Sequence, residues 1–419
     1  MSSRFPLPLA RWRSGEWLDR RRVLAYSAIL LAVEIAGFLF LIAGTHGWIV
    51  PLTRATTTDF VSFYAAGALA DAGTPQLAYD QAAHLAAEER ATSPGIEYEY
   101  FYYPPVFLML CALLARLPYL PAFLLFEAAS LAAFLLVARR IVGDRSWTAL
   151  LPLLAFPALF WTLGLGQNAF LTAALFGAAT LLVDRRPVAA GLLFGALCYK
   201  PHFGLLVPVA LAAARNWRAF AAAAASAIAL TGLSAVLFGV ETWRAFLAAG
   251  AASHAVYESG RVDLAGFVSP FGGILLLGGT PALAWAAQLV AALAAAALVG
   301  IVWRRGLSLP VRAAALAAAT LVAVPVALLY DMMLGAVAAA WLVRAGRESG
   351  FLPWEKLVLA VLLPIPMVAR NLGDAWHVPV APLATLCLLA VIARRAACEM
   401  LAQRPGRRTA EVAAAQFGA

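Results

Sequence analysis

Residues 168–200 read NAFLTAALFGAATLLVDRRPVAAGLLFGALCYK, two apolar runs separated by the short charged turn DRRP. A helix that crosses a membrane needs about 20 mostly apolar residues, and apolar runs recur along the whole chain. Of its 419 residues, 63% are hydrophobic and 13% are charged, whereas soluble domains are about 25% charged. So few charges cannot cover a water-soluble body of this size. The sequence therefore predicts an all-α, polytopic membrane protein.

The number and direction of the crossings follow from the apolar runs and the basic residues beside them. In lipid the backbone polar groups must be paired within each segment, so the runs are helices rather than open strands. Lys and Arg in short loops mark the cytoplasmic side, and the Arg-rich N-terminus is placed there. This threading predicts about twelve transmembrane helices with both termini inside: 23–45, 104–138, 147–163, 168–183, 187–200, 203–214, 219–239, 281–302, 312–329, 332–343, 354–369 and 379–393.

The run 104–138 is long enough to be read in two ways. Pro118 and Pro121 can divide it into two elements. Two full crossings would reverse the orientation of every later helix and place the Arg clusters outside, against the positive-inside rule. One crossing plus a non-spanning or tilted helix is therefore preferred. The run 203–214 is short for a span, which is typical of a broken helix beside a cavity.

The predicted organisation has a basic cytoplasmic N-terminus at 1–22, a transmembrane domain at 23–395 and a basic cytoplasmic tail at 396–419. The transmembrane domain carries a first outer loop at 46–103 and a second at 240–270. The first apolar run is too long for a cleavable signal peptide. The net charge of +9 lies beside membrane helices, so no nucleic-acid partner is expected. We expect a multi-pass protein of the cell inner (plasma) membrane, surrounded by membrane lipids.

The first outer loop carries the main candidate residue, Asp59. Thr58 is a plausible N-cap, and Asp59 then lies in the first turn of a short amphipathic helix. A second short amphipathic helix is expected at 80–90, followed by EYEYFYYPPV, in which Tyr102 and Tyr103 stand beside the membrane. Taken alone, Asp59 is equally a simple helix-start carboxylate, and tyrosines are common at membrane interfaces.

Two further segments carry polar residues at predicted helix ends. GLGQNAFL places Gln167 and Asn168 beside glycines, where the plainer interpretation is a turn between two spans. CYKPHFG places Lys200 and His202 around a proline at a predicted membrane boundary. An ionisable residue there is a functional candidate by default, and a lysine beside exposed backbone N–H groups suits a phosphate. The alternative is a lysine that reaches to the interface from an ordinary helix end.

The remaining candidates are single charged residues near the predicted outer side: Asp331 in ALLYDMMLG, Arg370 in MVARNLGDAWH and Arg261 in the second outer loop. For each of them an ordinary solvated loop or helix end is the alternative. The five histidines show no metal-binding spacing, so no protein-built metal site and no cofactor are expected.

Together, three motifs resemble a known family. TDFVSFYAAGALADAG in the first loop, GLGQNAFLTAALFGAATLLVDRRPVAAGLLFGALCYKPHFGLLVP in the middle and ALLYDMMLG later are similar to glycosyltransferase family 87 of the GT-C superfamily, across about residues 55–345. The family includes polyprenyl-phosphate-mannose-dependent mannosyltransferases. The chain departs from commoner members around ALLYDMMLG, which leaves the sugar and the acceptor open.

The resemblance implies a GT-C-like bundle and an inverting hexosyltransferase of the cell envelope. A polyprenyl-phosphate-linked sugar (mannose or another hexose or pentose) is the expected donor, and a lipid or glycan is the expected acceptor. Asp59 takes the role of general base at the outer face. Lys200, then Arg370 or Arg261, are expected on the phosphate, with Gln167, Asn168, His202, Asp331, Tyr102 and Tyr103 around the sugar, the phosphate or the entrance. A multi-pass transporter or lipid flippase is the alternative function, and a structural subunit of envelope assembly is a third.

Overall fold

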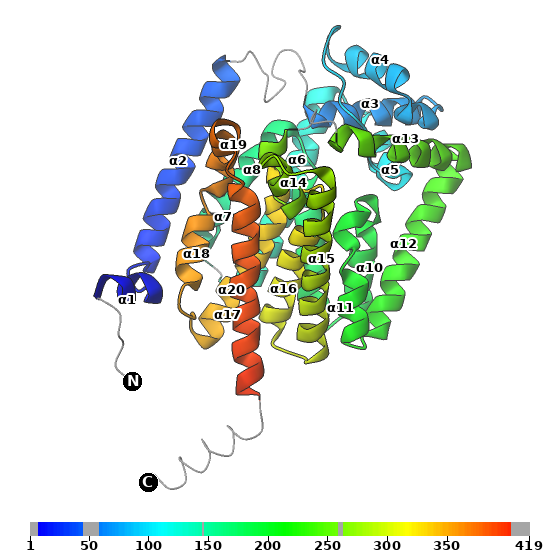
Figure 1. Cartoon of the computed structure of the whole chain (residues 1–419). Coiled ribbons are helices and arrows are strands. Elements are labelled where there is room, and N and C mark those ends of the chain that lie inside the picture. Colours follow the sequence, from blue (N-terminus) through cyan, green and yellow to red (C-terminus); the bar gives the residue numbers. More distant parts are fainter. Residues whose placement is uncertain (1–6, 45–57, 145, 259–262, 404–419) are drawn as a thin grey trace, which may run out of the picture.

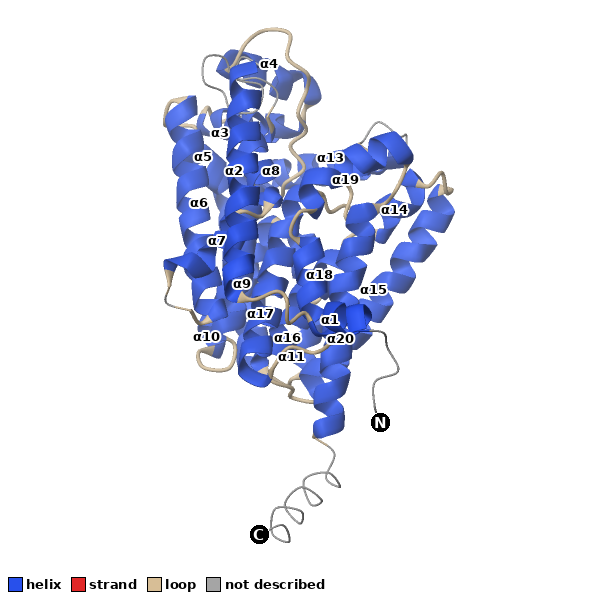
Figure 2. Ribbon diagram, turned by 90° about the vertical axis from the view of Figure 1, so that its left-hand side faces the viewer, coloured by secondary structure: helices blue, strands red, loops and turns tan. Residues whose placement is uncertain are grey.

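The computed structural model describes residues 7–44, 58–144, 146–258 and 263–403. Within these ranges the regular elements are all helices, without a β-strand (Figure 2), and the one extended pairing is an isolated antiparallel bridge between Phe267 and Leu328. The all-α prediction is confirmed over the described residues.

Six helices of the described residues are long and apolar enough to cross a membrane: α2 (Arg20–Gly44), α6 (Tyr119–Val142), α12 (Trp217–Phe238), α15 (Pro281–Arg304), α17 (Met332–Ser349, with the preceding turn η6, Leu329–Asp331) and α20 (Val380–Ala402). Two bent pairs raise the number to eight. They are η2 (Trp147–Leu150) and α7 (Leu151–Leu154) with α8 (Pro157–Leu165), and α18 (Glu355–Leu362) with α19 (Ile365–Trp376). The predicted count of about twelve stays a prediction.

The other apolar helices are shorter. They are α5 (Pro105–Leu114), α9 (Ala169–Leu182), α10 with the turn η3 (Pro187–Tyr199), the turn η4 with α11 (Pro201–Ala213) and α16 (Leu309–Ala323). A helix of 10 residues such as α5 is only about 15 Å long, half of the roughly 30 Å hydrocarbon core. The run 104–138 therefore forms one long helix, α6, preceded by the short α5, in agreement with the preferred interpretation.

Proline explains why two predicted single spans are bent. Pro157 follows the break between α7 and α8, and the bend there is 68°. Pro364 lies in the break between α18 and α19, where the bend is 67°. Proline removes a backbone donor and clashes with the preceding turn, so it ends or kinks a helix. The predicted spans 147–163 and 354–369 are each two helices at an angle.

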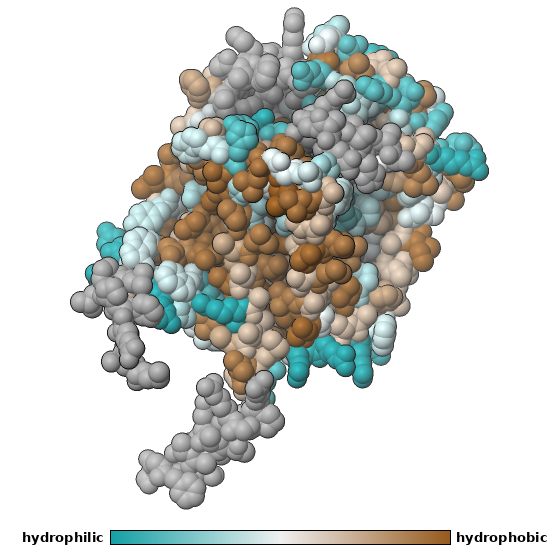
Figure 3. Space-filling model, viewed as in Figure 1, coloured by the Kyte–Doolittle hydropathy of each residue, from teal (hydrophilic) through white to brown (hydrophobic). Residues whose placement is uncertain are grey.

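The centre of the bundle is formed by α16 and α17, which are buried nearly all round. Their Ala-rich faces let the helix backbones approach closely. Such packing holds helices together in lipid, where no hydrophobic driving force acts between them. Outer helices such as α2, α12 and α15 instead expose large aliphatic side chains. Figure 3 shows this apolar surface along the side of the bundle, with more hydrophilic residues at its ends. The distribution is that of a protein surrounded by lipid.

One end of the bundle is rich in arginines. Arg312 pairs with Asp184, Arg347 with Asp144 at 3.1 Å and Arg395 with Glu355 at 2.6 Å, so each ion pair ties two chain segments together. The helix α1 (Leu7–Ser14) and the C-terminal end of α20 lie at this same end in Figure 1. We call it the basic end.

The opposite end carries α3 (Asp59–Asp71), the turn η1 (Pro75–Tyr79), α4 (Gln81–Ala91) and α13 (Val240–Glu258), as Figure 1 shows. Both short helices of the first loop are present where the sequence predicts them. However, α3 is not amphipathic. Phe60, Phe63 and Leu69 are buried within the protein, because α3 packs against both α4 and α5.

A glycine makes the contact between α3 and α5 close. A Cβ on Gly67 would stand 2.1 Å from the carbonyl oxygen of Cys111 in α5.

In the second outer loop, the 19-residue helix α13 is followed by the turn η5 (Leu264–Gly266) and the start of α14 (Pro270–Leu276). Past the predicted end of the transmembrane domain at 395, α20 continues to Ala402.

Candidate active site

Asp59 is the first residue of α3 and reaches a polar residue 108 positions later in the chain. Its Oδ2 accepts a hydrogen bond of 2.7 Å from Nε2 of Gln167. Thr58 precedes it with extended backbone angles, as at an N-cap, although its side chain makes no capping hydrogen bond. The Thr58 hydroxyl instead lies 3.3 Å from that of Tyr119 at the start of α6. The N-terminus of α3 is thus fixed above the helices that follow it.

Gly166 brings the two partners together. It ends α8 in the left-handed region, with φ of +68°, which glycine adopts without the steric cost of a side chain. A Cβ at this position would stand 2.5 Å from Cβ of Phe60 and 2.9 Å from the ring of Phe123. Only a residue without a side chain lets the first turn of α3 approach the junction of α8 and α9 closely enough for Gln167 to reach Asp59.

Gln167 holds a second group with its amide oxygen. Oε1 accepts a hydrogen bond of 3.2 Å from the Tyr103 hydroxyl and one of 3.3 Å from the backbone N–H of Asn168. The carbonyl of Tyr103 in turn accepts one of 2.8 Å from the Tyr79 hydroxyl in η1. The orientation of the Gln167 amide is therefore determined, with its NH₂ group directed at Asp59.

Lys200 continues the network below Asn168. Its ammonium donates to Oδ1 of Asp331 at 2.7 Å and to Oδ1 of Asn168 at 3.3 Å. The side chains of Lys200 and Asp331 are only 5% and 3% exposed, which makes this a buried ion pair. Oδ2 of Asp331 accepts from the backbone N–H of Leu328 at 3.1 Å. The amide nitrogen of Asn168 is buried and makes no hydrogen bond among the described residues.

A lysine ammonium has three N–H donors, and two of those of Lys200 are used in this network. The rings of Phe203 and Tyr330 lie 4.9 Å and 5.3 Å from its nitrogen. The third N–H of Lys200 and the amide nitrogen of Asn168 therefore have no hydrogen-bond acceptor among the described residues. A phosphate oxygen is the group that such donors suit.

The carboxylates at this end are partly or fully buried. Burial raises the pKa of Asp59, while the Gln167 hydrogen bond and the Lys200 charge act in the opposite direction. Burial together with the charge of Asp59 raises the pKa of Glu99 to about 8. Burial also raises the pKa of Glu88 to about 8 and lowers that of His84 to about 4. A carboxylate of raised pKa is a stronger base than one in water.

Glu99, Glu88 and His84 are not among the residues that the sequence predicts for the site. Two hydrogen bonds hold their segments beside α3: Ser62, one turn after Asp59, donates to the Tyr100 carbonyl at 3.2 Å, and His84 lies 3.1 Å from the Ser62 carbonyl. Glu88 accepts from the Glu99 backbone N–H at 3.2 Å. The sequence signal for Glu99 is the dense carboxylate and tyrosine pattern EYEYFYY, whereas His84 and Glu88 lie in the short helix predicted at 80–90, and neither pattern identifies a partner.

Four of the predicted residues stand outside the network. His202 has an exposed side chain whose ring packs on Phe203, and this ring makes no hydrogen bond with the described residues. The Tyr102 ring stacks on that of Tyr100 with centroids 5.1 Å apart. Arg370 in α19 pairs with Asp263 at 3.0 Å. Arg261 lies outside the described residues.

The arrangement can perform acid–base and anion-binding chemistry. A carboxylate of raised pKa stands at one end of the network, an amide bridge in the middle and a buried ammonium at the other end. No group of three His, Cys, Asp or Glu side chains within the described ranges is arranged to hold a metal ion. The groups present are those that accept a proton and neutralise a phosphate.

Comparison with known proteins identifies one family. The family model of glycosyltransferase family 87 matches residues 101–330, more than half of the chain. The match includes Tyr103, Gln167, Asn168 and Lys200, and it ends one residue before Asp331. Asp59 precedes it. No curated protein and no solved structure matches the chain.

Proposed function

The chain belongs to glycosyltransferase family 87 and is a membrane glycosyltransferase, and we propose that it transfers a sugar from a polyprenyl-phosphate donor to a lipid or glycan acceptor. The donor sugar is mannose or another hexose or pentose, and the bundle is of the GT-C type. The family assignment favours this function over the transporter or flippase alternative. The single observation that carries the proposal is the hydrogen-bonded network that connects Asp59 to Lys200 through Gln167 and Asn168.

In the proposed reaction, Asp59 is the general base. The acceptor hydroxyl attacks the anomeric carbon, and its proton passes to the Asp59 carboxylate. The bond between the anomeric carbon and the phosphate oxygen breaks, and the electron pair leaves with the polyprenyl phosphate. Attack from the side opposite the leaving group inverts the anomeric configuration. General-base assistance of this kind contributes about 10²–10⁴-fold to the rate.

Lys200 stabilises the leaving group in this proposal. The polyprenyl phosphate is already an anion, so a cation can replace a general acid. The buried Lys200 ammonium acts in a medium where charge interactions are stronger than in water, and Asp331 and Asn168 hold it in place. Arg370 and the Tyr102 ring are proposed at the periphery, at the entrance of the site.

The orientation of the site follows from the basic end. Asp331 precedes α17, which reaches the basic end at Arg347, about 24 Å further along the helix axis. We therefore place the reaction at the outer face of the inner membrane, with residues 1–22 and 396–419 in the cytoplasm and 23–395 as the transmembrane domain. The phosphate then lies near the outer boundary of the hydrocarbon and the prenyl chain below it.

The test is transfer activity of the purified protein in lipid with a panel of polyprenyl-phosphate sugars, with mass spectrometry of the extracted lipids and glycans. Asp59→Asn is expected to lower the transfer rate at least 10²-fold. Asp71→Asn, on the exposed end of the same helix and paired among the described residues with Arg116 at 2.9 Å, is the matched control and is expected to keep full activity. Full activity of Asp59→Asn would refute the proposal that Asp59 is the general base. No turnover of any polyprenyl-phosphate sugar would refute the proposed class of donor.

A further inference from the structure

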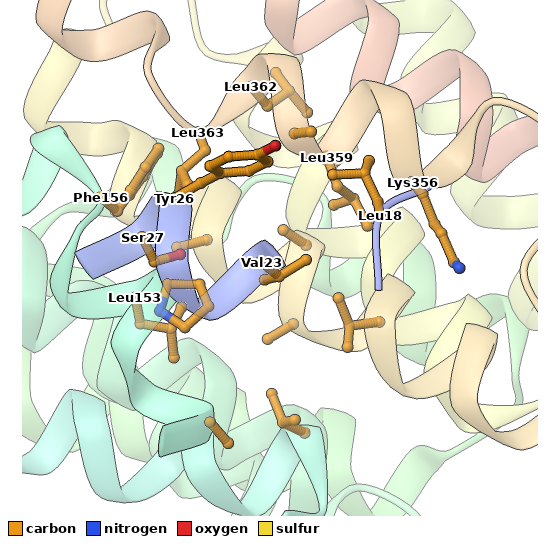
Figure 4. Close-up of a pocket in the computed structure, with 18 of the residues that line it drawn as sticks. Leu18, Val23, Tyr26, Ser27, Leu153, Phe156, Lys356, Leu359, Leu362 and Leu363 are labelled. Carbon is orange, nitrogen blue, oxygen red and sulfur yellow. The ribbon is translucent and has the colours of Figure 1, made fainter. Parts of the chain in front are cut away.

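A cavity lies between α2 and the rest of the bundle. Its volume is about 610 Å³, within the range of ligand-binding pockets. Figure 4 shows side chains of α2 (Val23, Tyr26 and Ser27) together with Leu153 and Phe156 on one side and Leu359, Leu362 and Leu363 on the other. The breaks between α7 and α8 and between α18 and α19 both border it. The cavity thus lies beside the points where both helix pairs bend.

The long wall of the cavity is one face of α17. The lining residues of this helix recur every three or four positions, as one face of a helix requires, and run from Met332 to Arg347: Met332, Gly335, Ala336, Ala339, Ala340, Val343 and Arg347. Fifteen residue steps correspond to about 22 Å. Small side chains occupy the middle of this wall. The cavity is therefore a long, narrow, apolar channel, which suits an extended hydrocarbon chain.

The basic end of the cavity is charged. Arg20, Arg347 and Lys356 line it together with Asp19 and Asp144. Asp144 pairs with Arg347. Arg20 donates to the Thr148 hydroxyl at 3.1 Å and Lys356 to the Gly15 carbonyl at 3.3 Å, and neither forms an ion pair within the described residues. The charge of Arg20 also stabilises the Asp144 carboxylate. Three cations against two carboxylates leave this rim net positive, at the end where an anionic headgroup of the inner leaflet would lie.

The cavity is distinct from the candidate active site. Neither Asp59 nor any other member of its hydrogen-bonded network lines it. An empty apolar cavity of this size would leave its lining without contacts on one side. We propose that it holds one anionic glycerophospholipid of the inner leaflet, with its acyl chains along α17 and its phosphate at Arg20 and Lys356. Basic pockets between helices on the cytoplasmic side bind anionic lipid headgroups. This proposal does not depend on the reaction proposed above.

Native mass spectrometry of the purified full-length protein, titrated with phosphatidylglycerol or phosphatidylcholine, tests the proposal. The wild-type protein is expected to retain one phosphatidylglycerol with about 30-fold preference over phosphatidylcholine, because each of two cations contributes about fivefold. Ala339→Phe places a ring in the channel and is expected to lower retention of both lipids at least tenfold. The double variant Arg20→Gln/Lys356→Gln is expected to keep binding but lose the preference.

Two matched controls test the location. Ala294→Phe makes the same change on the exposed face of α15, and Arg305→Gln removes an exposed cation that does not line the cavity. Both are expected to bind like the wild type. Equal retention of the two lipids by the wild type, unchanged preference in the double variant, or a retained polyprenyl phosphate in place of the phospholipid would each overturn the proposal. If Ala339→Phe does not fold, the double variant still decides, since both of its sites lie at the charged rim.

Discussion

The Lys200–Asp331 ion pair gives a prediction that separates folding from function. The two side chains are almost fully buried and 2.7 Å apart. Removing one partner of such a pair leaves an uncompensated buried charge, which costs about 3–5 kcal/mol, whereas replacing both partners by apolar residues of similar volume is often neutral or stabilising. We therefore expect Lys200→Met and Asp331→Leu each to lower the free energy of unfolding by about 3–5 kcal/mol. The double variant is expected to regain most of that loss.

Activity is expected to behave differently from stability. If Lys200 binds the donor phosphate, the double variant folds but does not recover transfer. A hydrogen bond to a charged group contributes about 1.5–3 kcal/mol, so donor affinity is expected to fall by roughly tenfold to a hundredfold. The free energy of unfolding is measured by denaturant titration in detergent, and donor affinity by titration of the same preparations with a polyprenyl-phosphate sugar.

Two results would refute this reasoning. A double variant as unstable as the single variants would mean that the two side chains do not compensate one another's charge. A stable double variant with wild-type donor affinity would mean that Lys200 serves only the fold. Arg116→Met is the control for loss of a cation, because its pair with Asp71 is exposed and exposed pairs contribute at most about 1 kcal/mol.

Three further predictions concern the groups around Asp59. Gly166→Ala is expected to cost about 1–2 kcal/mol from its left-handed backbone and more from contact with α3. It is expected to lower the transfer rate about 10²-fold, because a misplacement near 1 Å is enough for such a loss; unfolding and initial-rate assays measure both. Tyr103→Phe removes one hydrogen bond from Gln167, so the transfer rate is expected to fall a few-fold. Glu99 binds its proton more tightly in the folded protein, where its pKa is about 8. Its contribution to the free energy of unfolding is therefore complete below about pH 4.5 and is lost as the pH rises to about 8. Its ionisation adds a negative charge beside Asp59, and donor affinity is expected to decline above pH 8 in the wild type but not in Glu99→Gln.

Each of these variants has a matched control. Gly143 is also left-handed, with φ of +70°, but has open space where a Cβ would stand, so Gly143→Ala carries the backbone cost alone. If it lowers activity as much as Gly166→Ala, the contact with α3 is irrelevant. Glu88→Gln is expected to keep the alkaline decline. Tyr100→Phe, on an exposed ring, is expected to leave the transfer rate unchanged. Equal effects of the two tyrosine variants on this rate would contradict the bridging role of Tyr103.

The sequence by itself determined the class of the protein. Apolar runs and scarce charges specify membrane helices because partition into lipid depends on local composition. The same local information places the N-termini of α3 and α4: Asp80 is the N-cap of α4 and accepts a hydrogen bond from Ala83. It also locates Gln167 and Lys200 at helix ends, and it identifies the family that the match over residues 101–330 shows.

Only the tertiary structure decided which of these residues meet. Asp59 and Gln167 are 108 positions apart and Lys200 and Asp331 are 131, and no local pattern encodes such contacts. They depend on how helices pack, as the approach of Phe60 to Gly166 shows. For the same reason α3 is buried on both sides, and two predicted spans are bent around a cavity. Composition determines that a segment enters the membrane, whereas packing and proline determine where its side chains point.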